Sequence, residues 1–407
     1  MNRDGRARTR VVHMTTTDMS LDWLLGPQLL AFQAAGYEVI GMSAPGPHVA
    51  NLDAMGIEHV AMANFTRSND PTSDIKAFFD LVRELRRLRP DIVHTHNPKP
   101  GILGRIAARL TRVPLIVNTQ HGLYAQPDDR RRRRWPVYAV ERFAAAFGDV
   151  ELVQNSEDAA TLVNRLKVPA RRVRVLGNGV DLSRFDPASV TAGTRSRLRA
   201  EWGIAEGDIV FGAVGRLVIE KGMAEMFAAH RRLRDEGAQL RLVVVGPLEP
   251  GKSDGLDEAA VEAARADGVI FLGQRNDMPE LYAAMDVFVT ATYREGFPRA
   301  AMEAAAMGLP IVATDIRGCR QVVDDGVTGV LVRVRDADAL AVGMRALIDD
   351  GPRREAMRAA ARPRALAEFD VQRVIEITLD AYRSGQGRGP RRKRRATSRE
   401  RAAATPR

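Results

Sequence analysis

Two glutamates, eight residues apart, flank the start of a predicted helix in the second half of the chain. Residues 293–303 read YREGFPRAAME, with Glu295 before Pro298 and Glu303 after it. Proline suits the first turn of a helix because it has no N–H to leave unpaired there, and the remaining free N–H groups attract an anion. Carboxylates on both sides of such a site suit the hydroxyls of a sugar attached to a phosphate. An ordinary solvated acidic loop before a helix has the same spacing and is the alternative.

A second segment that could do chemistry follows the predicted strand at residues 209–214. It reads GRLVIEKG and places Arg216 and Lys221 directly after that strand. A guanidinium is a planar fork of donors and an ammonium is a point charge, and both bind phosphate oxygens. The pair can therefore neutralise a pyrophosphate. Two solvated bases on a loop are the alternative.

The charge of the chain is concentrated at its two ends. The net charge is +10 over 407 residues, of which residues 386–407 carry +8 and residues 1–10 carry +3, which leaves −1 for residues 11–385. A nearly neutral body argues against a basic nucleic-acid-binding scaffold, so nucleic acid is not expected as a partner. We expect residues 1–10 to be a basic N-terminal extension and residues 386–407 to be a disordered basic tail, because neither has an apolar period.

The composition also limits the compartment and the chemistry. Cys319 is the one cysteine, which excludes an intramolecular disulfide and a cysteine-based zinc cage. No apolar run approaches the roughly 18 residues that a membrane span requires. The N-terminus lacks the apolar segment of a secretory signal. We therefore expect a cytoplasmic protein.

Short β-branched runs alternate with helical patterns throughout the first half of the chain. The predicted strands are residues 9–14, 37–42, 58–62, 91–95, 115–118, 151–154 and 173–176. Their apolar residues are continuous, which is typical of a parallel sheet covered on both faces. The sequence therefore predicts a doubly wound α/β domain over residues 11–185.

Turn chemistry interrupts this pattern near residue 180, where the chain reads GNGVD. A second series of predicted strands follows, at residues 209–214, 240–245, 269–272, 287–290, 311–314 and 330–332. We predict a second α/β domain over residues 200–368, and a final amphipathic helix at about 370–384 that joins the first domain. Ligands bind beyond the carboxyl ends of the strands in such sheets, so two facing domains predict a cleft.

The two motifs, in this order, resemble those of the retaining glycosyltransferases of family 4, whose two Rossmann-like domains face a cleft (GT-B type). The resemblance extends from about residue 11 to residue 382. It implies that Arg216 and Lys221 bind the diphosphate of the donor. It also implies that Glu295 binds hydroxyls of the donor sugar and that Glu303 binds those of the ribose.

Further parts of the donor site follow from the same resemblance. It implies that main-chain groups of Gly296, Phe297 and Pro298 line the sugar and phosphate pocket, and that Arg275 contacts the base. The stretch NTQHG resembles the segment that carries the family's active-site histidine. We therefore expect the catalytic residues to be His121, Arg216, Lys221 and Glu295.

The candidates for the acceptor side are Asp18, His94, His96 and Asn178. Asp18 stands where family members often have a Gly-Gly loop, although it could equally cap the helix that follows. Asn178 belongs to a stretch that resembles the family's N-G-V-D segment between the domains. His94 and His96 lie two residues apart at a strand end, with no carboxylate at a spacing that suits a metal site. We expect them to line the cleft.

A run of arginines stands directly before Trp135 and Tyr138. Its members are Arg130, Arg131, Arg132, Arg133 and Arg134. Adjacent like charges repel, so the run needs solvent or an anionic partner, and neighbouring aromatics suit a membrane interface. We expect the run, together with the basic tail, to contact an anionic membrane surface at its inner face, or a polyprenyl-diphosphate acceptor. A solvated loop is the alternative.

The resemblance implies a complete reaction. A hexose is transferred from a nucleoside diphosphate sugar, preferably a UDP-sugar, to a lipid-linked or polysaccharide acceptor with retention at the anomeric carbon. Two fixed cations stabilise the leaving diphosphate, so we expect no metal requirement and no cofactor. A nucleotide-sugar 2-epimerase of the same architecture is the enzymatic alternative, and a basic nucleic-acid-binding protein is the non-enzymatic one.

Overall fold

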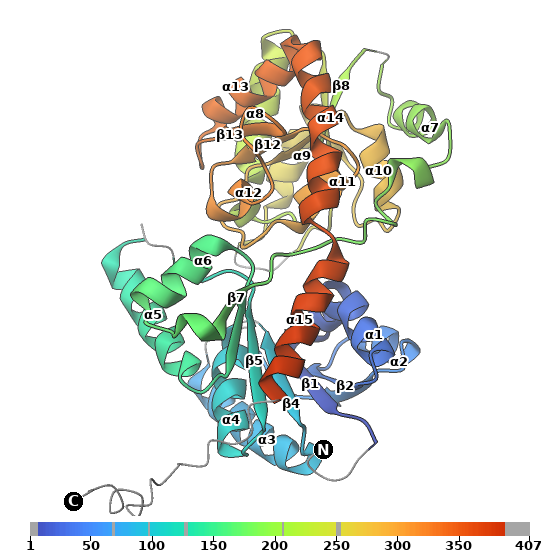
Figure 1. Ribbon diagram of the computed structural model, residues 1–407. Coiled ribbons are helices and arrows are strands. Elements are labelled where there is room, and N and C mark those ends of the chain that lie inside the picture. The colour runs from blue at the N-terminus through green and yellow to red at the C-terminus, as the bar shows by residue number, and fades with distance from the viewer. Residues whose placement is uncertain are drawn as a thin grey trace, which may run out of the picture.

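The computed structural model describes residues 7–66, 70–96, 98–125, 129–205, 207–249 and 254–386. Two lobes, each built on a parallel sheet with helices on both faces, are joined at a narrow waist (Figure 1). This arrangement confirms the predicted fold class of two Rossmann-like α/β domains. Of the expected terminal extensions, residues 1–6 and 387–407 lie outside the described residues.

The first sheet has seven strands in the order β3-β2-β1-β4-β5-β6-β7, all parallel. Its strands are β1 (Arg10–Thr17), β2 (Glu38–Ala44), β3 (Glu58–Ala61), β4 (Ile92–His96), β5 (Leu115–Gln120), β6 (Val150–Val153) and β7 (Val173–Val175). Each predicted strand of the first half is present. The central strands are buried on both faces, which is why their apolar residues are continuous rather than alternating.

The helices of the first domain are α1 (Gly26–Ala34), α2 (Val49–Ala54), α3 (Pro71–Leu88), α4 (Arg105–Leu110), α5 (Arg131–Ala145) and α6 (Ser156–Ala160). Short π-helices at Ser20–Leu25, Pro100–Gly104 and Thr161–Arg165 lead into or continue them. In α3, Asp70 caps the N-terminus by accepting a hydrogen bond from the Thr72 amide, and Leu81, Leu85 and Leu88 are buried on one helix face.

The arginine run is not a loop. Residues 131–134 form the first turn of α5, and Arg130 precedes that turn with an extended ψ of 135°. Arginine is a good helix former, so a run of arginines continues a helix readily once its charges point into solvent. The predicted alternative of a solvated loop is therefore wrong about the loop, because the run is helical. It is right about the solvent, because Arg131, Arg132 and Arg133 are exposed.

The second sheet has six parallel strands in the order β10-β9-β8-β11-β12-β13. They are β8 (Ile209–Val214), β9 (Leu240–Val245), β10 (Ile270–Phe271), β11 (Val287–Thr290), β12 (Ile311–Thr314) and β13 (Gly329–Val332). The helices are α7 (Thr194–Glu201), α8 (Met223–Asp235), α9 (Glu258–Ala266), α10 (Met278–Ala284), α11 (Arg299–Ala306), α12 (Arg317–Arg320), α13 (Ala337–Asp349) and α14 (Gly351–Glu368). One apolar core lies on each face of this sheet.

The last helix, α15 (Val371–Gln386), returns to the first domain (Figure 1). Its buried residues Val374, Ile375, Leu379 and Tyr382 belong to the apolar core on one face of the first sheet. At the waist the two chain crossings pair with each other. The Val180 amide donates to the Phe369 carbonyl at 2.9 Å, and the Val371 amide donates to the Val180 carbonyl at 3.2 Å.

The carboxyl ends of the two sheets face each other across the waist, because the loops that follow β5, β6 and β11 are in contact there. Among the described helices, none combines the length and the apolar composition that a membrane crossing requires. The fold therefore positions a site between the domains, at the edges where open α/β sheets bind ligands.

Candidate active site

The loop between β11 and α11 is held by main-chain contacts with the first domain. A Cβ at Gly296 would overlap the His121 carbonyl, so only glycine lets these two segments approach each other. Asn155 donates to the Gly296 carbonyl, and Asn178 donates to the Phe297 carbonyl, both at 3.3 Å. The first domain thus contacts the loop that the resemblance assigns to the donor sugar, residues 291–298, here called the donor loop. Asn178 contacts this loop rather than an open acceptor surface.

Lys221 and Glu295 meet at the head of this loop. Lys221 ends a 3₁₀ turn (Ile219–Lys221) directly before Gly222, whose positive φ of 68° forms the N-cap of α8. The Lys221 Nζ atom forms an ion pair with the Glu295 Oε1 atom. An ammonium has three donors, so it can contact a phosphate oxygen while it keeps the carboxylate. The predicted phosphate ligand and the predicted sugar ligand therefore converge on one point.

The other two predicted donor cations face acids of the second domain. The Arg216 Nη1 atom lies 2.9 Å from the Glu249 Oε2 atom. The Arg275 guanidinium contacts Asp277 at 2.8 Å and 2.5 Å, and that hydrogen bond raises the pKa of Arg275. Both arginines lie beyond the carboxyl ends of strands, Arg216 after β8 and Arg275 after β10, where the resemblance places them.

Glu303 is buried on α11, behind the donor loop. It accepts hydrogen bonds from the Tyr282 hydroxyl and from the Arg299 Nε atom, each at 3.1 Å. Burial raises the pKa of the Glu303 carboxyl, against the lowering effect of Arg299. The helix begins at Arg299, so Pro298 occupies the N-cap position and not the first helical turn as predicted.

His121 follows β5, and both of its ring nitrogens contact protein groups. Its Nδ1 lies 3.3 Å from Gln154 Nε2, and its Nε2 lies 3.1 Å from His96 Nδ1. Burial lowers the pKa of His121 to about 4, so the ring is neutral at physiological pH. The side of His121 that borders the donor loop is its main-chain carbonyl.

His94 and His96 do not line the cleft, and the expectation that they do is wrong. Each is 1% exposed, because α15 covers the sheet face from which they project. Their ring nitrogens bond to Tyr382, Thr119, His13 and His121. The sequence around His94 and His96 does not indicate that α15, whose Tyr382 is 288 residues from His94, covers this sheet face.

Asp18 contacts a neighbouring loop and does not cap the helix that follows it. It is 6% exposed and accepts a hydrogen bond from the His48 amide at 2.7 Å. The π-helix that follows has Met19 at its N-cap, with no side-chain cap. Asp18 therefore ties the end of β1 to the loop between β2 and α2, and the capping alternative is wrong.

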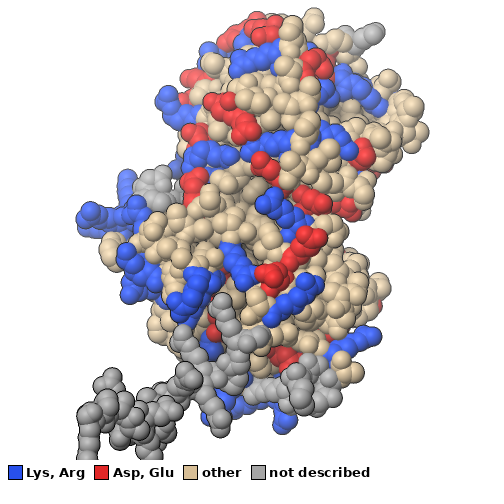
Figure 2. Space-filling model, viewed as in Figure 1, with Lys and Arg blue, Asp and Glu red and all other residues tan. Residues whose placement is uncertain are grey.

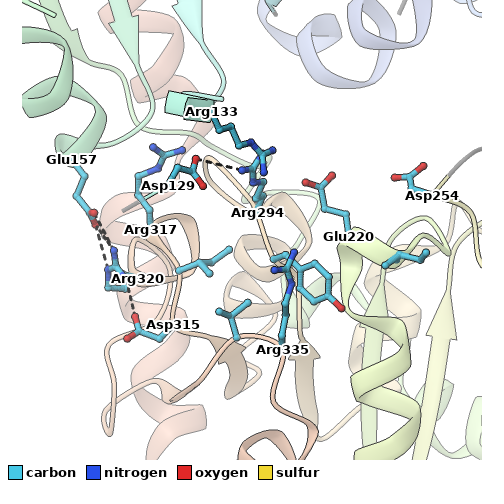
Figure 3. A pocket seen from close by; sticks show the side chains of 14 residues that line it. Asp129, Arg133, Glu157, Glu220, Asp254, Arg294, Asp315, Arg317, Arg320 and Arg335 are labelled. Atoms are coloured by element: carbon cyan, nitrogen blue, oxygen red, sulfur yellow. Dashed lines mark hydrogen bonds and ion pairs between the residues drawn. The ribbon is translucent and has the colours of Figure 1, made fainter. Parts of the chain in front are cut away.

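Two adjoining cavities lie between the domains. The larger, of about 860 Å³, is bounded by Asp129, Arg133 and Glu157 of the first domain. Its other wall comes from the second domain and includes Glu220, Tyr293, Arg294, Arg317, Arg320 and Arg335. Figure 3 shows charged side chains of both domains around this space, with the Arg294–Asp129 and Arg320–Glu157 pairs drawn.

The smaller cavity, of about 190 Å³, lies at the donor loop itself. Its lining includes His121, Gly122, Glu295 and Gly296, and it shares Glu220, Arg294 and Arg317 with the larger one. A small polar cavity beside Glu295 that shares lining residues with a larger one offers space for two ligands side by side.

A buried ion pair that the sequence did not reveal also joins the two domains, in addition to the Arg294–Asp129 and Arg320–Glu157 pairs. Arg317 of α12 is 5% exposed and pairs with the buried Asp158 of α6, and it also donates to the Leu123 carbonyl at 3.2 Å. Burial raises the pKa of Asp158, and the nearby Arg317 opposes that shift. The sequence carries one indication of this pair, its position, because Asp158 and Arg317 both lie shortly after strands, β6 and β12, at the facing edges of the two sheets.

Comparison with known proteins identifies the family of both domains. Residues 29–184 match the family described as Glycosyltransferase Family 4, and residues 194–364 match Glycosyl transferases group 1. The chain belongs to glycosyltransferase family 4. This confirms the predicted family and favours glycosyl transfer over the epimerase and nucleic-acid-binding alternatives.

Individual relatives agree with this assignment. The UDP-Gal:alpha-D-GlcNAc-diphosphoundecaprenol alpha-1,3-galactosyltransferase of Escherichia coli is 30% identical to this glycosyltransferase over 311 residues, which are 76% of this chain and 79% of that protein. The capsular polysaccharide biosynthesis glycosyltransferase CapM of Staphylococcus aureus is 26% identical, over 92% of this chain and 96% of that protein. The structure of Anabaena Alr3699/HepE in complex with UDP-glucose has the same fold, with a TM-score of 0.76 and 20% identity over 93% of this chain and 100% of that one.

Proposed function

We propose that this glycosyltransferase transfers a hexose from a UDP-sugar to a lipid-linked or polysaccharide acceptor, with retention at the anomeric carbon. The observation that carries the proposal is the convergence of Lys221, Glu295 and Gly296 beside a small polar cavity between the domains. The Escherichia coli relative is named for UDP-Gal and a diphosphoundecaprenol acceptor, and this name supports the donor and acceptor classes.

The donor half of the reaction is electrostatic. When the bond between the anomeric carbon and the phosphate oxygen breaks, negative charge develops on the leaving diphosphate. Lys221 and Arg216, together with the N–H groups at the start of α11, supply positive charge at the edge of the second sheet where that diphosphate binds. Fixed cations reduce the need for a metal ion on the leaving group.

Retention is proposed to occur by attack on the face that the diphosphate leaves. A double displacement would need a carboxylate free to act as nucleophile, whereas Glu295, which lines the smaller cavity, is paired with Lys221. The ring of His121 is also engaged at both nitrogens. The acceptor hydroxyl therefore forms the new bond to the anomeric carbon and passes its proton to the departing phosphate oxygen.

The larger cavity and α5 are proposed to receive the acceptor. Arg133 lines that cavity and belongs to α5, whose Trp135, Val140 and Phe143 are 67%, 44% and 58% exposed. Positions 135 and 143 fall on one helical stripe. Figure 2 shows basic side chains gathered on the side of the first domain where α5 lies. A helix with exposed aromatics and arginines suits an anionic bilayer surface, from which a lipid-linked acceptor can reach the cavity.

Replacing Arg131, Arg132 and Arg133 with serine is expected to weaken binding to anionic vesicles by about 100-fold, because each arginine near such a surface contributes about 1 kcal/mol. Co-sedimentation with phosphatidylglycerol vesicles measures this. The matched control replaces three exposed arginines of α3, Arg83, Arg86 and Arg87, and it should leave binding near wild type. Equal loss in both variants would mean that binding follows net charge alone, and no loss in the α5 variant would refute docking through α5.

The donor class is tested by saturation-transfer NMR on the wild type and on Glu303→Ala. The panel is UDP-glucose, UDP-galactose, the UDP-N-acetylhexosamines, UDP-glucuronate and GDP-mannose. We expect a response to one or a few UDP-sugars that is lost in the variant. The stereochemistry is read separately from the product, and an α-anomeric donor should give an α-linked product. A response to GDP-mannose alone would refute the UDP preference, and inversion in the product would refute same-face attack.

A further inference from the structure

Three buried histidines, the partly exposed His121 and one buried tyrosine form a continuous hydrogen-bond chain behind the cleft, here called the histidine relay. His13 lies on β1, His94 and His96 lie on β4, His121 follows β5, and Tyr382 lies on α15. Near the cleft, the links are Gln154 Nε2 to His121 Nδ1 (3.3 Å), His121 Nε2 to His96 Nδ1 (3.1 Å) and His96 Nε2 to His13 Nδ1 (3.1 Å). Near α15, the links are His13 Nε2 to Tyr382 Oη (3.2 Å), Tyr382 Oη to His94 Nδ1 (2.6 Å) and His94 Nε2 to Thr119 Oγ1 (2.7 Å).

Strand register brings these residues together. His13 and His94 are directly opposed on neighbouring parallel strands, and the period of two places His96 on the same sheet face as His94. Phe32 stacks on His13 at 5.3 Å, and α15 closes the face with Tyr382. None of His13, His94 and His96 is more than 1% exposed.

A metal site is the alternative explanation for three clustered imidazoles. One ring nitrogen from each of His13, His94 and His96 lies within 4.8 Å of the others. However, both nitrogens of each ring already pair with a protein group. The rings of His94 and His96 also stack at 4.2 Å, whereas metal ligands radiate from one ion. The hydrogen-bond chain accounts for the geometry and a metal does not.

The chain has a direction. The Gln154 Nε2 group can only donate, so His121 accepts at Nδ1 and carries its proton on Nε2. In the same way, His121 Nε2 donates to His96 Nδ1, and His96 Nε2 donates to His13 Nδ1. The Nε2 atom of His13 then donates to the Tyr382 hydroxyl, which donates to His94 Nδ1. Each ring is thereby the neutral Nε2–H tautomer. Burial agrees, because it lowers the pKa of His13 to about 3 and the pKa of His96 well below its usual value.

We propose that the histidine relay is a positioning device for glycosyl transfer: it holds His121 as the Nε2–H tautomer in one ring orientation, so that the His121 main chain stays against Gly296 of the donor loop. His13, His94, His96 and Tyr382 are the positioning residues. Their effect reaches the reaction through His121, whose carbonyl and Gly296 touch across the cleft. The inference rests on the proposed function only where turnover is measured.

The relay also connects the cleft to α15. That helix begins directly after the waist and carries the hydroxyl through which His13 and His94 are linked. Tyr382 is 0% exposed in the core of the first domain. The packing of α15 against the first domain therefore helps to orient His121 at the donor loop.

The test uses the full-length protein with nitrogen-15 in its histidine rings. Nitrogen spectra separate protonated from unprotonated ring nitrogens, and we expect His121 to be protonated at Nε2 and unprotonated at Nδ1. Protonation of His121 at Nδ1, or at both nitrogens near pH 7, would overturn the proposal. This arm needs no substrate, so it holds whether or not a donor has been found.

The activity arm compares two replacements of His96. His96→Leu removes the acceptor of the His121 Nε2–H group, and we expect kcat to fall by about 10- to 100-fold with unchanged donor affinity, as loss of positioning does. His96→Asn retains an acceptor oxygen near the Nδ1 position and should recover most of the activity. Wild-type kcat in His96→Leu, or no recovery in His96→Asn at equal thermal stability, would overturn the proposal.

A second variant covers the case in which His96→Leu does not fold. Tyr382→Phe keeps the ring and its packing and removes one hydroxyl that links His13 to His94. We expect new tautomer populations at His13 and His94 in the nitrogen spectra, together with a smaller loss of kcat. Unchanged spectra at both histidines would show that the hydroxyl is not a link in the chain.

Discussion

Replacing Lys221 with alanine should lower kcat/KM by about 10²- to 10³-fold, the usual cost of removing one preorganised group that stabilises transition-state charge. The ammonium stands beside Glu295 at the end of a 3₁₀ turn, so in the proposed reaction it is in place before the diphosphate begins to leave. A fixed cation needs no reorganisation when charge develops. The fold should be retained, because Lys221 is only partly buried.

Steady-state kinetics with the best donor of the panel would measure this effect, and circular dichroism would check the fold. The matched control is Lys76→Ala, an exposed lysine on α3, which should leave kcat/KM unchanged. Part of the loss comes from leaving Glu295 without its cation, and the double variant Lys221→Ala/Glu295→Gln separates that part. A Lys221→Ala protein with near-normal kcat/KM would remove Lys221 from the donor site.

The second large effect concerns Glu303. We expect Glu303→Ala to weaken donor binding by about 10- to 100-fold, because hydrogen bonds to a charged acceptor contribute about 1.5–3 kcal/mol. The buried carboxylate is oriented by Tyr282 and Arg299, and its pKa is raised by burial. Calorimetric titration with the UDP-sugar measures the affinity.

The control for this variant is Tyr282→Phe, which removes one hydrogen bond to the carboxylate and leaves the carboxylate in place. A raised carboxyl pKa also gives the sign of the pH dependence. The wild type should lose donor affinity as pH falls toward that raised pKa, at a higher pH than an ordinary glutamate would require. Glu303→Gln should lack this dependence. Donor affinity in Glu303→Ala equal to that of the wild type would refute the ribose role.

The sequence itself determined the features that depend on neighbours along the chain. Apolar, often β-branched runs predicted each strand of both sheets. The runs are continuous in the central strands, because those strands are buried on both faces. The GRLVIEKG and YREGFPRAAME segments are contiguous, so their loops could be placed at the ends of β8 and β11 from the pattern alone. The family assignment followed from these segments and is confirmed by the comparisons.

Only the tertiary structure decided what the polar residues of the first domain touch. His94 and Tyr382 are 288 residues apart and Arg317 and Asp158 are 159 apart, so their contacts depend on how α15 and the two lobes pack. The same packing buried His94 and His96, which the sequence had placed on the cleft, and turned Asp18 toward the β2–α2 loop. Hydrophobic pattern specifies which elements form, whereas the partners of a buried polar group depend on which elements meet, since each such group must find its hydrogen bond within the folded chain.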